Sequence, residues 1–234
     1  NESNAIIDST GAFLQLEYPD FQVIVVNDGS QDDTLDKLIT HFSMERVPFA
    51  PVEDLDARPI RGVYMSAKYP SLIVVDKENG GKADAVNAGI SISRNPLICV
   101  TDADSILERD CLLKIARPFM ENENTIAVGG IIRIANGCQI KQGRVVEIGL
   151  PKSWLGRFQV VEYLRAFLFG RTGFDAVNSM LIVSGAFGCF SREALVKLGG
   201  FRSGSIGEDM EIVVRMHRLL RRENPEIRIT FVPD

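Results

Sequence analysis

The chain lacks the features that define several large classes of protein. Its four cysteines are far apart and form no CxxC pair, and most lie in apolar surroundings, so we expect free thiols buried in a reducing compartment. No stretch reaches the roughly 18 consecutive apolar residues that a membrane-spanning helix needs. With 31 acidic against 26 basic residues, the net charge is −5. This charge argues against a general nucleic-acid binder, which needs a basic surface.

The ends of the chain lack the signals of a complete protein. The sequence begins at Asn1 with neither an initiator methionine nor a signal peptide, and it stops at Asp234, shortly after a predicted strand at 228–231. We therefore expect a piece of a longer protein. Its 234 residues, 45% of them hydrophobic, can bury the core of one large domain or two small ones.

What the chain does contain is a repeated order of strand and helix. Apolar runs rich in β-branched residues predict buried strands, and each is followed by a helical pattern. The strands are expected at 21–26, 71–75 and 97–101, and the helices at 34–42, 83–93 and 109–120. This order predicts an α/β fold with a doubly wound, mostly parallel sheet flanked by helices. Residues 43–70 are poorly periodic and are expected to form a long irregular excursion.

The second half mixes short strands with amphipathic helices. Strands are expected at 125–128, 130–135, 144–148 and 228–231, and helices at 155–169, 192–198 and 208–221. The helix at 155–169 carries Phe158, Val161, Leu164 and Leu168 on one stripe. This stripe either packs against the sheet or lies on a membrane surface.

Acidic motifs follow two of the predicted strands. Asp28 comes after the strand at 21–26, and Asp102 and Asp104 come after the strand at 97–101. Ligands of open α/β sheets bind at the carboxyl ends of the strands. Two like charges this close together are costly without a cation. A divalent metal and a phosphorylated ligand are therefore the first hypothesis for this edge of the sheet.

Two further motifs lie at the starts of helices. Glu208 and Asp209 occupy the first turn of the helix at 208–221, where carboxylates also complement the helix dipole. Lys82 lies in a glycine-rich turn, where its charge and free backbone N–H groups could both meet a diphosphate. Taken alone, Lys82 would be an ordinary solvated lysine. The segment matches neither a P-loop nor the GxGxxG dinucleotide fingerprint.

Together, five motifs resemble those of the family 2 glycosyltransferases with a GT-A fold. They are Asn27-Asp28-Gly29-Ser30, residues 77–89, Asp102-Ala103-Asp104, residues 184–188 and Gly207-Glu208-Asp209. They look most like bacterial membrane synthases of cellulose, hyaluronan and poly-N-acetylglucosamine. The resemblance implies one GT-A catalytic domain over 1–234, with a nucleotide-sugar-binding half at 1–120 and an acceptor-binding half at 121–234. Because Asn1-Glu2 is similar to the end of the family's first-strand motif, the first strand is expected to be absent.

The resemblance implies donor-binding roles for three aspartates. Asp28 would accept a hydrogen bond from the uracil imide of a UDP-sugar; a turn with a helix cap is the alternative. Asp102 and Asp104 would form a DxD pair that binds Mg²⁺ or Mn²⁺. Asp104 would bind the metal directly, while Asp102 would contact the ribose or metal-bound water. A surface turn is the alternative for this pair.

The same resemblance implies that Asp209 is the catalytic residue. An inverting transfer needs one base to take the proton from the acceptor hydroxyl, so a single carboxylate suffices. The alternative for Glu208 and Asp209 is simple stabilisation of a helix N-terminus. Residues 184–190 would form a wall beside the acceptor sugar, or else a core strand. The residues expected to contact substrates are Glu2, Asp28, Lys82, Asp102, Gly185 and Glu208.

The function expected from the resemblance is metal-dependent, inverting transfer from a UDP-sugar to a glycan or lipid-linked acceptor. The whole protein would be a bacterial inner-membrane enzyme, anchored through segments outside this chain, with this domain in the cytoplasm and no nucleic-acid partner. The alternatives are a non-processive transferase to a lipid-linked acceptor, an impaired nucleotide-sugar-binding domain and a nucleotidyltransferase. The membrane synthases carry a Gln/Arg-x-x-Arg-Trp motif after the catalytic acid, whereas Trp154, the sole tryptophan, precedes Asp209. Processivity is therefore not implied, and little activity is expected from this piece alone.

Overall fold

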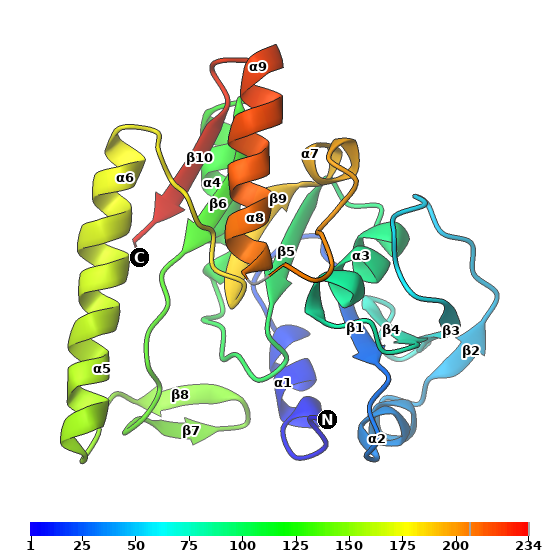
Figure 1. Cartoon of the computed structure of the whole chain (residues 1–234). Coiled ribbons are helices and arrows are strands. Elements are labelled where there is room, and N and C mark those ends of the chain that lie inside the picture. Colours follow the sequence, from blue (N-terminus) through cyan, green and yellow to red (C-terminus); the bar gives the residue numbers. More distant parts are fainter. Residues whose placement is uncertain (206, 234) are drawn as a thin grey trace.

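The computed structural model describes residues 1–205 and 207–233 and has the α/β class expected from the sequence (Figure 1). Eight of the strands within the described residues form two four-stranded sheets, and helices pack around both. None of the helices within the described residues has the length and apolar character needed to cross a bilayer.

The first sheet has the strand order β1-β4-β3-β2. Its strands are β1 (Val23–Asp28), β4 (Leu72–Lys77), β3 (Ile60–Met65) and β2 (Glu45–Val47). Its helices are α1 (Ile6–Phe13), α2 (Thr34–His41) and α3 (Lys82–Ile92). Strands β1 and β4 are parallel, whereas β3 pairs antiparallel with both of its neighbours. Strand β4 lies between β1 and β3 and is buried along its whole length.

The second sheet has the strand order β10-β6-β9-β5. Its strands are β10 (Arg228–Val232), β6 (Thr125–Gly130), β9 (Phe187–Ser191) and β5 (Leu97–Thr101). Its helices are α4 (Cys111–Glu121), α7 (Arg192–Lys197) and α8 (Glu208–Arg215), which continues through η2 (Met216–Leu220) into α9 (Arg221–Glu223). Only β10 and β6 are parallel among the pairs of this sheet.

A hairpin and one long helix stand at the side of the second sheet (Figure 1). The hairpin pairs β7 (Gln139–Lys141) with β8 (Arg144–Glu147). The helix runs through α5 (Trp154–Leu164), the π-helical segment η1 (Arg165–Arg171) and α6 (Thr172–Ala176). In Figure 1 the hairpin lies beside the amino-terminal end of this helix.

Several expectations about the elements need correction. The sheets are mixed rather than mostly parallel, because β3 and β9 each run against their neighbours. The region 43–70 is not wholly irregular, since it contributes β2 and β3. The strand expected at 130–135 does not form beyond Gly130, which ends β6. Helix α1 and strand β7 had no clear sequence signal.

Of the two alternatives for the apolar stripe of the helix at 155–169, packing against the sheet is wrong. Phe158 is 68% exposed and Val161 is 63% exposed, and Leu164 and Leu168 are exposed as well. The helix meets the core through a different side, on which Phe167 is buried and Tyr163 and Ala166 pack against the main cluster. The apolar stripe therefore faces away from the sheet.

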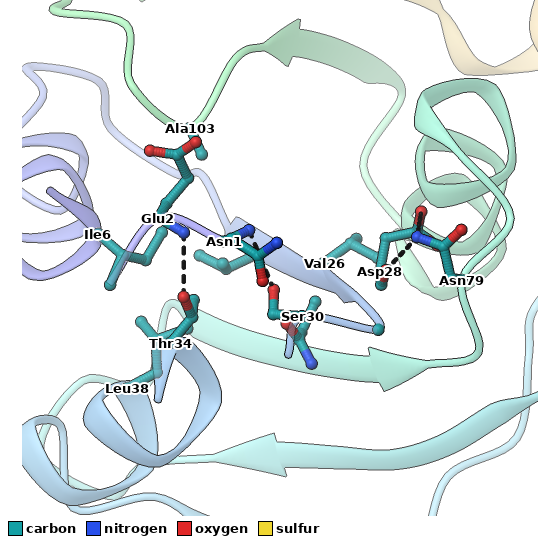
Figure 2. Close-up of a pocket in the computed structure, with 13 residues that line it drawn as sticks. Asn1, Glu2, Ile6, Val26, Asp28, Ser30, Thr34, Leu38, Asn79 and Ala103 are labelled. Atoms are coloured by element: carbon teal, nitrogen blue, oxygen red, sulfur yellow. Dashed lines mark hydrogen bonds between the residues drawn. The ribbon is translucent and has the colours of Figure 1, made fainter. Parts of the chain in front are cut away.

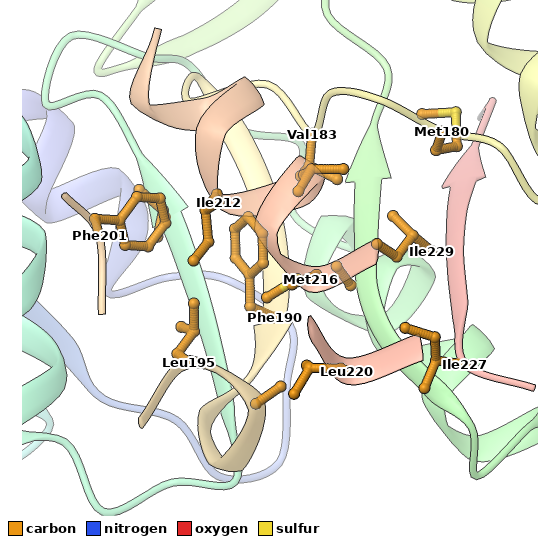
Figure 3. Packing of buried hydrophobic residues seen from close by; sticks show 14 of the residues in the cluster. Met180, Val183, Phe190, Leu195, Phe201, Ile212, Met216, Leu220, Ile227 and Ile229 are labelled. Carbon is orange, nitrogen blue, oxygen red and sulfur yellow. The ribbon is translucent and has the colours of Figure 1, made fainter. Parts of the chain in front are cut away.

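The main hydrophobic core fixes α8 on the second sheet (Figure 3). Ile212 and Met216 are fully buried and share a cluster with Phe190 of β9 and Ile229 of β10. They lie four residues apart, so they point to the same face of the helix. This packing determines where the first turn of α8, with Glu208 and Asp209, lies relative to β9.

All four cysteines are free, as expected, but they are not all buried. Cys111 and Cys189 are buried, and burial raises the pKa of Cys111 to about 12. Cys99 is exposed because β5 is the last strand of its sheet. Strand β1 is likewise an edge strand of the first sheet. The absence of a first strand stays a prediction, and these two sheet edges are compatible with it.

Candidate active site

The predicted site residues come from four separate parts of the chain. Asp28 is the last residue of β1, and Asp102 and Asp104 follow the end of β5. Lys82 is the first residue of α3, and Asp209 lies in the first turn of α8. Each of these positions is the end of a strand or the start of a helix, as the sequence predicted.

Four of the predicted residues make direct contacts with one another. The Nζ atom of Lys82 lies 2.5 Å from Oδ1 of Asp102 and donates to the backbone oxygen of Gly185 at 3.1 Å. The backbone N–H of Gly185 in turn donates to Oδ2 of Asp209 at 3.4 Å. Lys82, Asp102, Gly185 and Asp209 thus form one chain of polar contacts, here called the catalytic cluster.

Gly185 is the residue at which the backbone comes closest to the side chains of the catalytic cluster. A Cβ atom at position 185 would lie 2.9 Å from Nζ of Lys82 and 3.8 Å from Cβ of Asp209. A larger residue would therefore displace the lysine from Asp102. The glycine at position 185 therefore allows Lys82 to come close to the backbone of the segment 184–188. This is in addition to any room that the segment leaves for a sugar ring.

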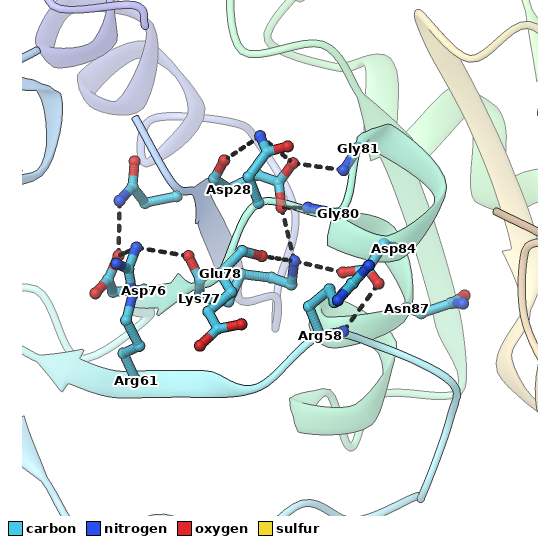
Figure 4. Close-up of polar contacts among 12 residues, drawn as sticks. Asp28, Arg58, Arg61, Asp76, Lys77, Glu78, Gly80, Gly81, Asp84 and Asn87 are labelled. Atoms are coloured by element: carbon cyan, nitrogen blue, oxygen red, sulfur yellow. Dashed lines mark hydrogen bonds and ion pairs between the residues drawn. The ribbon is translucent and has the colours of Figure 1, made fainter. Parts of the chain in front are cut away.

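Asp28 belongs to a second network (Figure 4). Its Oδ1 accepts from Nζ of Lys77 at 2.6 Å and from the N–H of Gly80 at 2.9 Å, and its Oδ2 accepts from the N–H of Gly81 at 2.8 Å. The side chain of Asn79 donates to Oδ2 at 3.2 Å. Burial would raise the pKa of Asp28, but the hydrogen bonds from Lys77 and the two glycine amides prevail and lower it.

This network gives the glycine-rich turn a different role from the predicted one. The N–H groups of Gly80 and Gly81 were expected to be free for a diphosphate, whereas both are used by Asp28. Gly81 has φ of +86°, a backbone conformation that glycine adopts without strain. The turn therefore connects the two networks, because Gly81 holds Asp28 and the next residue, Lys82, holds Asp102.

Lys77 is the centre of the second network and was missed as a site residue. Its side chain has no exposed surface, and it forms ion pairs with both Asp28 and Asp84. The carboxylate of Asp84 also accepts from the backbone N–H of Arg58 at 2.9 Å. A buried cation between two carboxylates fixes the end of β4 to the end of β1 and to the first turn of α3.

A cavity of about 280 Å³ opens beside Asp28 (Figure 2). Its polar rim includes Asn1, Glu2, Asp28 and Asn79. Ile6, Val25, Val26, Leu38 and Ala103 supply its apolar walls. The backbone N–H of Glu2 donates to Oγ1 of Thr34 at 3.0 Å, which ties the start of the chain to α2. A cavity that combines apolar walls with convergent polar groups is a common form of a small-molecule site.

Asp104 is the least engaged of the predicted residues. It is exposed, and within the described residues no side chain pairs with it. The same part of the chain holds no group of three or more His, Cys, Asp or Glu side chains arranged for a metal ion. Two carboxylates still suit Mg²⁺ or Mn²⁺ when phosphate oxygens of a substrate complete the shell. Asp102 and Asp104 therefore fit a metal shared with a diphosphate, and they do not form a metal cage by themselves.

Glu208 contributes less to the site than its neighbour Asp209. It is half-buried in the first turn of α8, and within residues 1–205 and 207–233 its side chain makes no hydrogen bond or ion pair. The structure therefore gives no contact through which Glu208 would orient Asp209.

Arg171, at the end of η1, is a second residue that the sequence reading missed. Its guanidinium lies 3.7 Å from the ring centroid of Phe167. Burial lowers the pKa of Arg171 to about 10, and the negative charge of Asp209 acts in the opposite direction. Among the described residues its Nη1 atom finds no hydrogen-bond partner. Arg171 is thus a partly buried cation that interacts with the charge of Asp209 and has, within the described part of the chain, an unpaired N–H donor at Nη1. Such a side chain is suited to bind an anionic group near the catalytic cluster.

Comparison with known sequences finds relatives over most of the chain. The family model for glycosyl transferase family 2 matches residues 1–198. The poly-beta-1,6-N-acetyl-D-glucosamine synthase of Staphylococcus epidermidis is 27% identical over 218 residues, which cover 93% of this chain and 43% of that protein. The enzyme of the same name from Staphylococcus aureus strain MSSA476 is 29% identical over 223 residues, with the same coverage. The chain thus spans less than half the length of these curated relatives.

Comparison with solved structures supports the same fold. The mannosyltransferase PcManGT of Pyrobaculum calidifontis, solved with GDP-Man and Mn²⁺, superimposes with a TM-score of 0.65 at 19% identity, over 100% of this chain and 52% of that one. Glucosyl-3-phosphoglycerate synthase of Mycobacterium tuberculosis, solved with Mn²⁺, UDP and glucosyl-3-phosphoglycerate, gives 0.55 at 15% identity, over 100% and 67%. The GT-A fold predicted from the sequence is confirmed by these neighbours.

Proposed function

Because the chain belongs to glycosyltransferase family 2, we propose that it transfers a hexosyl group, with inversion, from a UDP-sugar to a glycan acceptor. The observation that carries the proposal is the catalytic cluster, in which Lys82 contacts both Asp102 and Gly185, and Gly185 contacts Asp209. These residues lie up to 127 positions apart in the sequence, from 82 to 209. Their meeting at one place would set a base and a cation beside Asp102, one of the two proposed metal ligands.

Asp209 is proposed as the catalytic base. Among the described residues, the one hydrogen bond to its Oδ2 is the long bond from Gly185, and its Oδ1 accepts from the N–H of Met210 at 2.9 Å. Each carboxylate oxygen has a second lone pair, so one oxygen can still take the proton of an acceptor hydroxyl. Single-displacement transfer needs no second carboxylate as nucleophile.

The donor is proposed to lie between the cavity and the catalytic cluster. Lys82 and Arg171 supply positive charge for the diphosphate, and Asp102 and Asp104 would hold Mg²⁺ or Mn²⁺. The metal, when bound, neutralises charge that develops on the departing diphosphate. Asp28 already accepts four hydrogen bonds, so contact with a uracil imide requires one donor to yield. The bond from Asn79 is the longest of the four, and it is the one expected to break.

The acceptor is proposed to be a growing polysaccharide. The support is the similarity to the two staphylococcal synthases, whose names state a polymeric product. From the resemblance of its motifs to those of bacterial membrane synthases, the whole protein is proposed to act at a bacterial inner membrane, with this domain in the cytoplasm, and the halves 1–120 and 121–234 to bind donor and acceptor. Transfer to a lipid-linked acceptor is the second candidate.

Asp104→Asn is expected to weaken UDP binding in the presence of Mn²⁺ by about tenfold or more, because asparagine brings no charge to the metal. Binding measured without metal should change little. Glu108→Gln is the matched control, since Glu108 is an exposed carboxylate four residues further along that pairs with Lys114 instead. Equal Mn²⁺-dependent affinities for all three proteins would remove Asp104 from the metal site.

A further inference from the structure

The segment 139–169, which contains hairpin β7–β8, helix α5 and the first part of η1, concentrates exposed apolar side chains. It holds 12 of the 24 large hydrophobic residues that are exposed in the described part of the chain, although it makes up about an eighth of the sequence. Trp154 is 73% exposed, Leu155 79% and Ile148 86%. Soluble monomers rarely gather so much apolar surface in one place without a partner for it.

The exposed residues of α5 form one face. Trp154, Phe158 and Val161 are spaced by four and three residues, so they project from the same side of the helix. Attachment to the core comes from the opposite side, through Tyr163 and Phe167, and α5 itself contains no buried residue. The exposed face is therefore not required for packing this domain.

The charge of this segment differs in sign from that of the chain. Residues 139–165 contain five Lys or Arg and two Glu, a net charge of +3, whereas the whole chain carries −5 and the remainder therefore −8. The five basic residues are Lys141, Arg144, Lys152, Arg157 and Arg165. Basic and apolar side chains in one segment of an acidic chain favour an anionic, partly apolar partner.

We propose that the exposed face of α5, continued by hairpin β7–β8, lies on the surface of an anionic lipid bilayer. On the exposed face of α5 and at the start of η1, the basic residues Arg157 and Arg165 lie among the apolar side chains, and Trp and Phe next to Lys or Arg are typical of segments that lie at a lipid interface. Arg157 lies 5.3 Å from the Trp154 ring, where its guanidinium can reach phosphates while the ring enters the interface. Charged residues are depleted from the core of protein interfaces, so Arg157, Glu162 and Arg165 along this helix disfavour a second protein as the occupant.

Trp154 makes the proposal directly measurable, because it is the only tryptophan of the chain. On addition of vesicles of phosphatidylcholine mixed with phosphatidylglycerol, its fluorescence is expected to shift to shorter wavelength and to be quenched by brominated acyl chains. Binding to vesicles of phosphatidylcholine alone should be at least about tenfold weaker, because each Lys or Arg near an anionic surface contributes about 1 kcal/mol. No spectral shift with the anionic vesicles would overturn the proposal.

Two variants test whether vesicle binding depends on the exposed face of α5 or on any exposed apolar residue. Phe158→Glu with Val161→Glu should reduce vesicle binding by about tenfold or more, since charges replace two residues that would enter the interface. Met120→Glu changes an 85% exposed residue of α4 and should leave binding unaltered. Equal loss in both proteins, or a Trp154 shift that depends on protein concentration without vesicles, would contradict the proposal, and the second result would indicate a second copy of the chain. UDP binding tests none of these outcomes, so a failure of this inference can be told apart from a failure of the proposed transfer activity.

Discussion

Replacement of Asp209 by asparagine is expected to lower turnover by about 10²- to 10⁴-fold and to leave UDP binding nearly unchanged. Asparagine keeps an oxygen that can accept from the N–H of Gly185, so the local geometry should persist. It cannot take up the proton of an acceptor hydroxyl. Turnover is measured as UDP released by the full-length protein at saturating donor, and UDP affinity is measured separately by calorimetry.

Asp36→Asn is the matched control for the alternative role of Asp209. Asp36 is an exposed carboxylate in the first turn of α2, as Asp209 is in the first turn of α8. If Asp209 only complemented a helix dipole, both substitutions would cost a few tenths to about 1 kcal/mol of stability and neither would affect turnover specifically. Loss of UDP binding in Asp209→Asn would instead mean that the base is misassigned.

Replacement of Lys77 by methionine is expected to reduce the free energy of unfolding by about 3–5 kcal/mol. Methionine fills a similar volume but leaves Asp28 and Asp84 together without their shared cation. The loss follows from uncompensated carboxylates with little access to water, since the side chain of Asp84 is 8% exposed and that of Asp28 20%. Urea unfolding at neutral pH measures the change.

Lys82→Met provides the comparison for Lys77, because it removes the same charge five residues further along. The Lys82 side chain is 39% exposed and its partner Asp102 is 40% exposed. Exposed ion pairs contribute about 1 kcal/mol or less, so stability should change little while UDP binding weakens. A stability loss in Lys82→Met as large as that in Lys77→Met would contradict the division between the two networks.

The sequence predicted those parts of the site that local patterns determine. The strand at 97–101 was predicted with its observed bounds, and this placed Asp102 and Asp104 just beyond its carboxyl end. The helix that begins with Glu208 was predicted from the spacing of its apolar residues, and it carries Asp209 in its first turn. In the first case the apolar pattern ends at the residue before Asp102, and in the second it begins three residues after Asp209.

The rest depends on contacts between distant segments. Lys77 lies beyond the strand predicted at 71–75, whereas it ends β4, and its buried side chain pairs with Asp28, 49 residues earlier. The periodicity of α5 correctly identified an apolar face but could not indicate what that face meets, and Phe158 proved to be exposed. Strand direction likewise depends on which strands become neighbours, so the mixed sheets could not be read from the order of elements alone.

The most direct measurement of the central claim is calorimetric titration of the chain with UDP, with and without Mn²⁺. The proposed division of roles, with Asp28 beside the base, Asp102 and Asp104 at the metal and Lys82 at the diphosphate, predicts saturable binding that strengthens by about tenfold or more when Mn²⁺ is present. Binding that is equally strong without the metal would contradict the role of Asp102 and Asp104. No binding under either condition would contradict the nucleotide-sugar site itself.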